Sequence, residues 1–182
     1  MEQRMIIAGT GGQGVMVTGK ILGYAASDHD KFASFLPRYG TQMRGGTSSC
    51  TLIVSDEEIG SPIVSVADLL IIFQQSALEK YIDKLKPGGI LFLDSDTCSE
   101  ETARQRKDIE VIGLPVDEEA RALGSKQVAN IIMLGAYAVR TGMFTTEEII
   151  HTLRHVFENK PAVWEINEKA IRKGAELMKA RR

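Results

Sequence analysis

The feature that most constrains the fold is a glycine-rich turn, Gly9-Thr10-Gly11-Gly12-Gln13-Gly14, set between two apolar segments. The run before it, from Met5 to Ala8, predicts a buried strand, and the run after it, from Val15 to Ala26, has helical spacing. Strand, glycine turn and helix in this order are typical of α/β proteins. The N–H groups at the start of such a helix, together with its dipole, favour a phosphate or carboxylate.

The rest of the chain alternates between strand and helix patterns. Strands are expected at Arg4–Ala8, Lys31–Leu36, Thr47–Ser55, Ile59–Val64 (an edge strand), Asp68–Phe73, Ile90–Leu93 and Ile109–Leu114. Helices are expected at Gly14–Asp28, Ser76–Lys84 with Ser76 as cap, Asn130–Arg140, Thr145 or Thr146 to Phe157, and from Pro161 onward. The Pro87-Gly88-Gly89 segment is expected to break the second helix.

This order predicts a three-layer α/β/α fold with a mixed, mostly parallel sheet. The connections between residues 36 and 64 are too short for helical crossovers, so the strands there should pair antiparallel. A length of 182 residues predicts one domain over residues 1–182.

Composition excludes several classes of protein. Hydrophobic residues make up 43% of the chain and charged residues 25%, as in ordinary globular proteins. A net charge of −2 gives no reason to expect nucleic acid or an anionic membrane as a partner. The N-terminal residues lack the pattern of a signal peptide, so a cytoplasmic location is expected.

Catalytic and metal-binding patterns are absent from the sequence. Cys50 and Cys98 show no CxxC spacing, and two thiols are too few for an iron–sulfur cluster. His151 and His155 have i,i+4 spacing but no HExxH pattern, and they are interpreted as solvated positions. We therefore expect no catalytic residue and no metal site, and an isolated chain without activity of its own.

Two nucleotide-binding motifs overlap the glycine turn without fitting it. Gly9, Gly11 and Gly14 satisfy G-x-G-x-x-G, but the second strand ends without the acidic residue that would bind a ribose. The segment from Gly14 to Lys20 resembles a P-loop, but Ile21 stands where a Ser or Thr is required. The glycines thus serve either tight strand–helix packing or a ligand that Gln13 helps to bind.

A second candidate region follows the second predicted strand. Residues 37–46 combine Arg38, Tyr39, Met43 and Arg44 with several glycines, a composition that suits contact with a phosphate, a carboxylate or a partner. This loop is expected at the same carboxyl edge of the sheet as the glycine turn, where open α/β sheets bind ligands. A solvated loop whose arginines pair with surface acids is the alternative.

Three further polar residues lie where predicted elements begin or end. Asn130 begins a predicted helix, so it either caps that helix or contacts a ligand. Asp94 and Asp96 follow a predicted strand and are turn formers first and site candidates second.

Several of these segments together resemble the gamma subunit of 2-oxoacid:ferredoxin oxidoreductases, which corresponds to one domain of the fused pyruvate enzymes. The resemblance covers nearly the whole chain and rests on Gly9–Gly14, Tyr39–Thr47, Ala67–Ile71, Lys86–Gly89, Asn130–Ala136 and Asn167–Gly174. One departure is Thr41-Gln42, where many members carry Pro-Glu.

The resemblance implies a non-catalytic subunit of a complex that oxidatively decarboxylates a 2-oxoacid with coenzyme A, giving acyl-CoA, CO2 and reduced ferredoxin. It places thiamine diphosphate, Mg and iron–sulfur clusters on partners, namely alpha and beta thiamine-binding subunits and a ferredoxin-like cluster subunit. It also implies a surface near the active site that helps to receive coenzyme A, and it leaves open whether the glycine turn contacts coenzyme A or only a partner subunit. By motif position, the residues assigned to this surface are Gly11, Gly12, Gln13, Gly14, Tyr39, Arg44, Gly45, Gly46 and Asn130. The alternatives are the small subunit of indolepyruvate:ferredoxin oxidoreductase and a stand-alone nucleotide-binding module.

Overall fold

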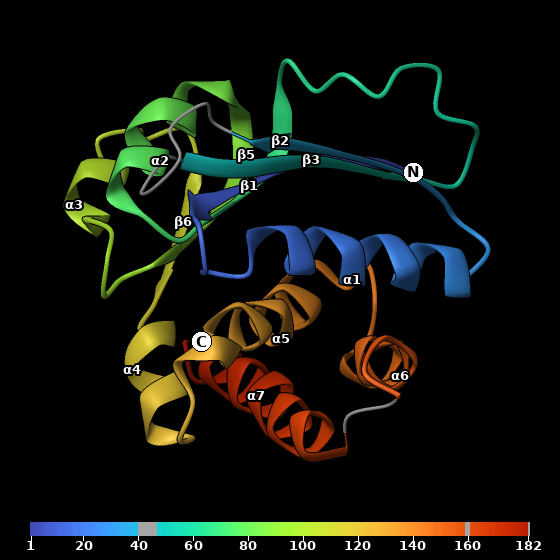
Figure 1. Cartoon of the computed structure of the whole chain (residues 1–182). Helices are drawn as coiled ribbons and strands as arrows, with labels where there is room; N and C mark the ends of the chain where they lie inside the picture. The colour runs from blue at the N-terminus through green and yellow to red at the C-terminus, as the bar shows by residue number, and fades with distance from the viewer. Residues whose placement is uncertain (40–46, 159–160, 182) are drawn as a thin grey trace. The chain divides into compact units, whose positions relative to one another are not determined.

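The computed structural model describes residues 1–39, 47–158 and 161–181. These residues form two compact units, unit 1 (Met1–Leu114) and unit 2 (Pro115–Arg182) (Figure 1). The single domain expected over residues 1–182 stays a prediction.

Unit 1 contains a six-stranded sheet with the order β2-β3-β1-β4-β5-β6. Its strands are β1 (Glu2–Thr10), β2 (Phe32–Tyr39), β3 (Thr47–Ser55), β4 (Ala67–Ile72), β5 (Leu85–Asp94) and β6 (Glu110–Leu114). β3 pairs antiparallel with both β1 and β2, whereas β1, β4, β5 and β6 pair in parallel. The mixed, mostly parallel sheet and the antiparallel pairing of its early strands are therefore confirmed.

Alternate side chains of β1 lie on opposite faces of the sheet. Ile6 and Ala8 join a cluster that includes Ala77, Leu78 and Tyr81 of helix α2 (Gln75–Tyr81). On the opposite face lies α1 (Val15–Asp28), whose Gly19 packs so closely against Phe35 and Cys50 that no Cβ would fit. Figure 1 shows α1 on one side of the sheet, with α2 and the short α3 (Glu100–Ala103) on the other. Helices therefore cover both faces, as expected for a three-layer fold.

The edge strand expected at Ile59–Val64 is wrong, because these residues form no strand. Pro62 cannot donate a hydrogen bond to a neighbouring strand, and the edges of the sheet are already formed by β2 and β6. Val64 is nevertheless buried in the core cluster, and Ile59 packs against it. The apolar pattern thus reflects burial without strand pairing.

Two other local predictions are also wrong. The N-cap of α2 is Gln74 rather than Ser76, because the helix begins almost directly after β4 ends. The Pro87-Gly88-Gly89 segment lies inside β5, where the register shifts between the pair Ala67/Leu85 and the pair Leu69/Ile90. Gly88 has a φ of +74° and donates its N–H to Asp108 O at 2.6 Å, so the glycines form a bulge in the strand. Between α2 and β5 the chain forms a single 3-10 turn, η1 (Ile82–Lys84).

Unit 2 is helical. Its elements are α4 (Val116–Ala122), the 3-10 turn η2 (Lys126–Val128), α5 (Ala129–Thr141), α6 (Thr146–Val156) and α7 (Pro161–Ala180). Thr145 caps α6 through a capping box, in which its hydroxyl accepts from Glu148 N at 3.2 Å and Glu148 Oε2 accepts from Thr145 N at 2.6 Å. Of the two residues predicted to begin this helix, Thr145 and Thr146, Thr145 is thereby confirmed as its cap.

The closest helix packing in unit 2 is between α5 and α7. A Cβ on Gly135 would overlap the carbonyl oxygen of Ile171, and a Cβ on Gly174 would overlap that of Ile132. Only glycine therefore lets the two backbones approach to this distance at both positions. In the sequence, the small residues Gly135 and Ala136 predict a close helix contact, and this prediction is confirmed. Across the described parts of the chain, no helix combines the length and apolarity that a membrane span requires.

Candidate functional site

The glycine turn and the ends of the arginine–glycine loop meet at one edge of the sheet in unit 1. The last residue of β1, Thr10, is opposite Thr47 at the start of β3. Ser48 is opposite Gly9 on one side and Tyr39, the end of β2, on the other. The expectation that both regions lie at the carboxyl edge is thus confirmed for the residues that flank the loop. We call this edge the rim, defined by residues 10–14, Tyr39 and Thr47.

The turn leaves the start of α1 open. Gly14 is the N-cap in a left-handed conformation with φ +75°; no side chain caps the helix, and its first turn has no acidic residue. Gly11 and Gly12 are exposed, and a Cβ on either would meet no atom within 4 Å. Backbone N–H groups and an unopposed helix dipole favour an anion at this position. The open space at Gly11 and Gly12 also lets another backbone approach.

Gln13 has a structural role that the sequence did not reveal. Its Oε1 accepts from Thr10 N at 2.7 Å, and its Nε2 donates to Phe73 O at 2.6 Å. The hydroxyl of Thr97 donates to the same carbonyl at 2.8 Å. These bonds connect the ends of β1, β4 and β5, so Gln13 fixes the shape of the turn.

The two interpretations of the glycines apply to different residues. A Cβ on Gly9 would lie 3.0 Å from Phe73 Cβ and 3.2 Å from Val15 Cγ2, and it would also crowd Gln13. Gly9 therefore serves tight strand–helix packing, whereas Gly11 and Gly12 face open space. The sequence had no signal that separated these two groups.

Part of the predicted site lies outside the described residues. Arg44, Gly45 and Gly46 belong to the segment that is not described, and Tyr39 is placed only as the end of β2. Beside the rim lies a cation that sequence reasoning missed, Lys80 of α2, which donates to Thr47 Oγ1 at 3.3 Å. Its spacing on α2 gave no hint of this position, because the contact joins residues far apart in the chain.

Asn130 and the aspartates have the following surroundings. In unit 2, Asn130 is 3% exposed and lies within α5, whose N-cap is Val128, so the capping role is wrong. In unit 1, Asp94 is buried and its Oδ1 accepts from Asp96 N at 3.1 Å, which confirms its turn-forming role.

The strand order also argues against a dinucleotide site. In dinucleotide-binding folds the second strand lies parallel beside the first, and the acidic residue at its end reaches the ribose. Here the antiparallel β3 occupies that position between β1 and β2.

Neither thiol is activated as a nucleophile. Burial raises the pKa of Cys50 to about 12. Burial likewise raises the pKa of Cys98 to about 11. Both thiols are therefore protonated near neutral pH, and protonated thiols are poor nucleophiles.

Comparisons with known proteins give a consistent result over nearly the whole chain. The family model described as pyruvate ferredoxin/flavodoxin oxidoreductase matches residues 4–177. The 2-oxoglutarate synthase subunit KorC of Methanothermobacter marburgensis is 34% identical over 98% of this chain and 97% of its own length. The ketoisovalerate oxidoreductase subunit VorA of the same organism is 36% identical over 96% of this chain, but this chain spans only 36% of VorA.

A solved structure agrees with the sequence matches. The crystal structure of the keto/oxoacid ferredoxin oxidoreductase gamma subunit from Geobacter sulfurreducens has a TM-score of 0.83 and 31% identity, over 99% of this chain and 98% of that one. The predicted fold class and family resemblance are confirmed. The chain therefore belongs to the pyruvate ferredoxin/flavodoxin oxidoreductase family.

Proposed function

We propose that the chain is the gamma subunit of a 2-oxoacid:ferredoxin oxidoreductase, in which it completes a reaction centre held by its partners. The complex would oxidatively decarboxylate a 2-oxoacid with coenzyme A and yield acyl-CoA, CO2 and reduced ferredoxin. The observation that carries this proposal is the match to two relatives of similar length, KorC and the Geobacter sulfurreducens gamma subunit, over nearly the full length of each.

The partners we propose are thiamine-binding alpha and beta subunits and a ferredoxin-like subunit with iron–sulfur clusters. Thiamine diphosphate and Mg would be held by the former and the clusters by the latter. The composition of this chain supports that division, because its two cysteines are too few for a cluster. The relatives are named for ketoisovalerate, 2-oxoglutarate and pyruvate, so we place the choice of 2-oxoacid in the partner subunits.

Within the complex, we propose that the rim receives the anionic part of coenzyme A. The open N-terminus of α1 and the exposed Gly11 and Gly12 favour an anion at this edge. Gln13 would hold the turn in shape through its bond to Phe73. Arg44, with Tyr39, Gly45 and Gly46, would supply charge and contact area from the loop. For Asn130, in unit 2, ligand contact stays a prediction from motif position alone.

Gly11→Ala tests the role of the turn without disturbing the chain itself. Gly11 has no positive φ, and a Cβ added there would meet no atom, so the variant should unfold like the wild type. If a ligand or partner backbone approaches Gly11, the added methyl group should raise the KM for coenzyme A or weaken assembly. Gly60→Ala is the matched control, since Gly60 also faces open space in unit 1. Equal kinetics and assembly for both variants would remove Gly11 from the site.

Arg44→Ala tests the charge that we assign to the loop. The variant complex should need more coenzyme A to reach half of its maximal rate, while its KM for the 2-oxoacid stays nearly unchanged. Loss of this cation should act on coenzyme A alone, because we place the 2-oxoacid, which is also an anion, in the partner subunits. An unchanged response to coenzyme A would exclude Arg44.

Two alternative functions predict different experimental results. The small subunit of indolepyruvate:ferredoxin oxidoreductase would copurify with partners that turn over aromatic 2-oxoacids in preference to aliphatic ones. A stand-alone nucleotide-binding module would bind NAD or ATP tightly in isothermal titration of the isolated chain. The absent ribose-binding acid and the intervening β3 argue against the second alternative.

A further inference from the structure

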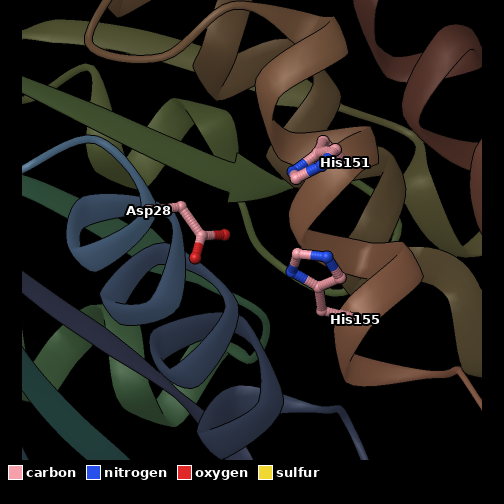
Figure 2. A group of neighbouring side chains, drawn as sticks. All are labelled: Asp28, His151 and His155. Atoms are coloured by element: carbon pink, nitrogen blue, oxygen red, sulfur yellow. The ribbon is translucent and has the colours of Figure 1, made fainter.

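The two neighbouring histidines of α6 are metal-ligating side chains that the proposed function does not use. His151 and His155 lie one turn apart, and their ring centroids are 4.6 Å from each other. Figure 2 shows both imidazoles projecting from α6; Asp28, also drawn there, belongs to unit 1 and is not part of the proposed site.

The fold of unit 2 fixes the face of α6 on which the histidines lie. Ile149, Ile150 and Leu153 are buried, which leaves His151 and His155 on the opposite, exposed face. The capping box at Thr145 holds the helix start, so the two histidines keep their i,i+4 relation.

The charged neighbours on this face are engaged by α7. The guanidinium of Arg154 lies over the ring of Trp164, at 4.7 Å from its centroid. Glu147 pairs with Arg172 at 2.7 Å. Both imidazoles are therefore exposed, while the side chains of Arg154 and Glu147 contact α7.

We propose that His151 and His155 bind a divalent transition-metal ion, of the class of Zn2+, Ni2+ or Cu2+, as a two-point chelate on α6. A nitrogen of one ring lies within 4.8 Å of a nitrogen of the other. Two imidazoles on one tetrahedral ion, at metal–nitrogen distances of about 2.0–2.1 Å, have nitrogens about 3.4 Å apart. Modest rotations of two exposed side chains bridge that difference. Imidazole selects this class of ion, whereas Mg2+ and Ca2+ prefer oxygen ligands. Water or a side chain of another subunit would complete the coordination.

The competing explanation is electrostatic. His155 lies in the last turn of α6, where a cationic side chain interacts favourably with the helix dipole. Such a role needs no metal and does not require His151.

Isothermal titration of the purified, untagged full chain with NiCl2 or ZnCl2 separates the two explanations. The wild type should bind one ion, and His151→Gln and His155→Gln should each weaken binding by at least about tenfold, because each removes one of two metal ligands. His29→Gln is the matched control, since it removes the third histidine of the chain and should leave binding unchanged. MgCl2 should give no binding.

Circular dichroism shows whether each variant keeps its helix content, which substitutions at the exposed His151 and His155 should preserve. Absence of Ni2+ and Zn2+ binding by the wild type would overturn the proposal. Binding that survives both single substitutions, or that is lost in His29→Gln, would overturn it as well. The test does not involve turnover, so its outcome is independent of the proposed subunit role.

Discussion

The α5–α7 crossing in unit 2 gives a prediction whose size follows from the structure. In Gly135→Ala the new Cβ would lie 2.9 Å from Ile171 C and 3.1 Å from Ala175 N, and it would overlap the Ile171 carbonyl oxygen. These are backbone atoms, so no side chain can rotate away and the helices themselves must separate.

Overpacking of this kind costs about 3 kcal/mol, at the upper end of the usual range. The better helix propensity of alanine returns about 1 kcal/mol. The net loss of about 2 kcal/mol should lower the unfolding midpoint by roughly 4–8 °C in a chain of this size. Gly174→Ala should behave alike, because its Cβ would lie 2.8 Å from Ile132 C.

Trp164 is the single tryptophan of the chain and lies in α7, so its fluorescence reports on unit 2 during thermal or urea unfolding. Once the helices have separated for one methyl group, the second should cost less, and the double variant should lose less than the sum of the single losses. Gly60→Ala, which has open space, should change the midpoint little. A Gly135→Ala protein as stable as the wild type would refute the close-crossing interpretation.

Three further predictions concern single contacts. Gln13→Ala removes the hydrogen bond to Phe73 O and should lower the free energy of unfolding by about 1–3 kcal/mol in urea titrations; an unchanged midpoint would contradict the structural role of this amide. Thr145→Ala removes a helix cap and should cost about 1 kcal/mol in thermal unfolding followed by Trp164 fluorescence, with Thr145→Ser as a control that keeps the stability. The Lys31 ammonium and then the N-terminal amine lower the pKa of Asp56 to about 2. This carboxylate therefore stabilises unit 1 above about pH 4 and loses its contribution as the pH falls through about 2. An NMR titration should show the low pKa of Asp56 and its rise in Lys31→Ala, and an ordinary pKa in the wild type would contradict the pairing.

Elements with a strong local signal could be predicted from the sequence. The continuous apolar run of β4, the glycine turn before α1 and the Thr145 capping box all involve residues close together in the chain. Burial and hydrogen bonding reinforce each of these patterns, so local reasoning was sufficient.

Features that depend on distant residues could not be predicted in the same way. Gln13 and Phe73 are 60 residues apart, and only the sheet brings them together. Gly135 indicated a close contact, but its partners Ile171 and Ala175 on α7 had no local signal. Residues 59–64 show the converse error, because burial of an apolar run does not require strand pairing.

We propose above that this chain completes a reaction centre held by partner subunits. The most direct test of this proposal is to purify the tagged chain from its native cells and to assay the recovered complex for ferredoxin reduction that depends on both a 2-oxoacid and coenzyme A. Thiamine-binding and cluster-bearing subunits should copurify with it, the complex should be active, and the chain alone should be inactive. Recovery of the chain without such partners, or catalysis of the redox reaction by the chain alone, would contradict the proposal.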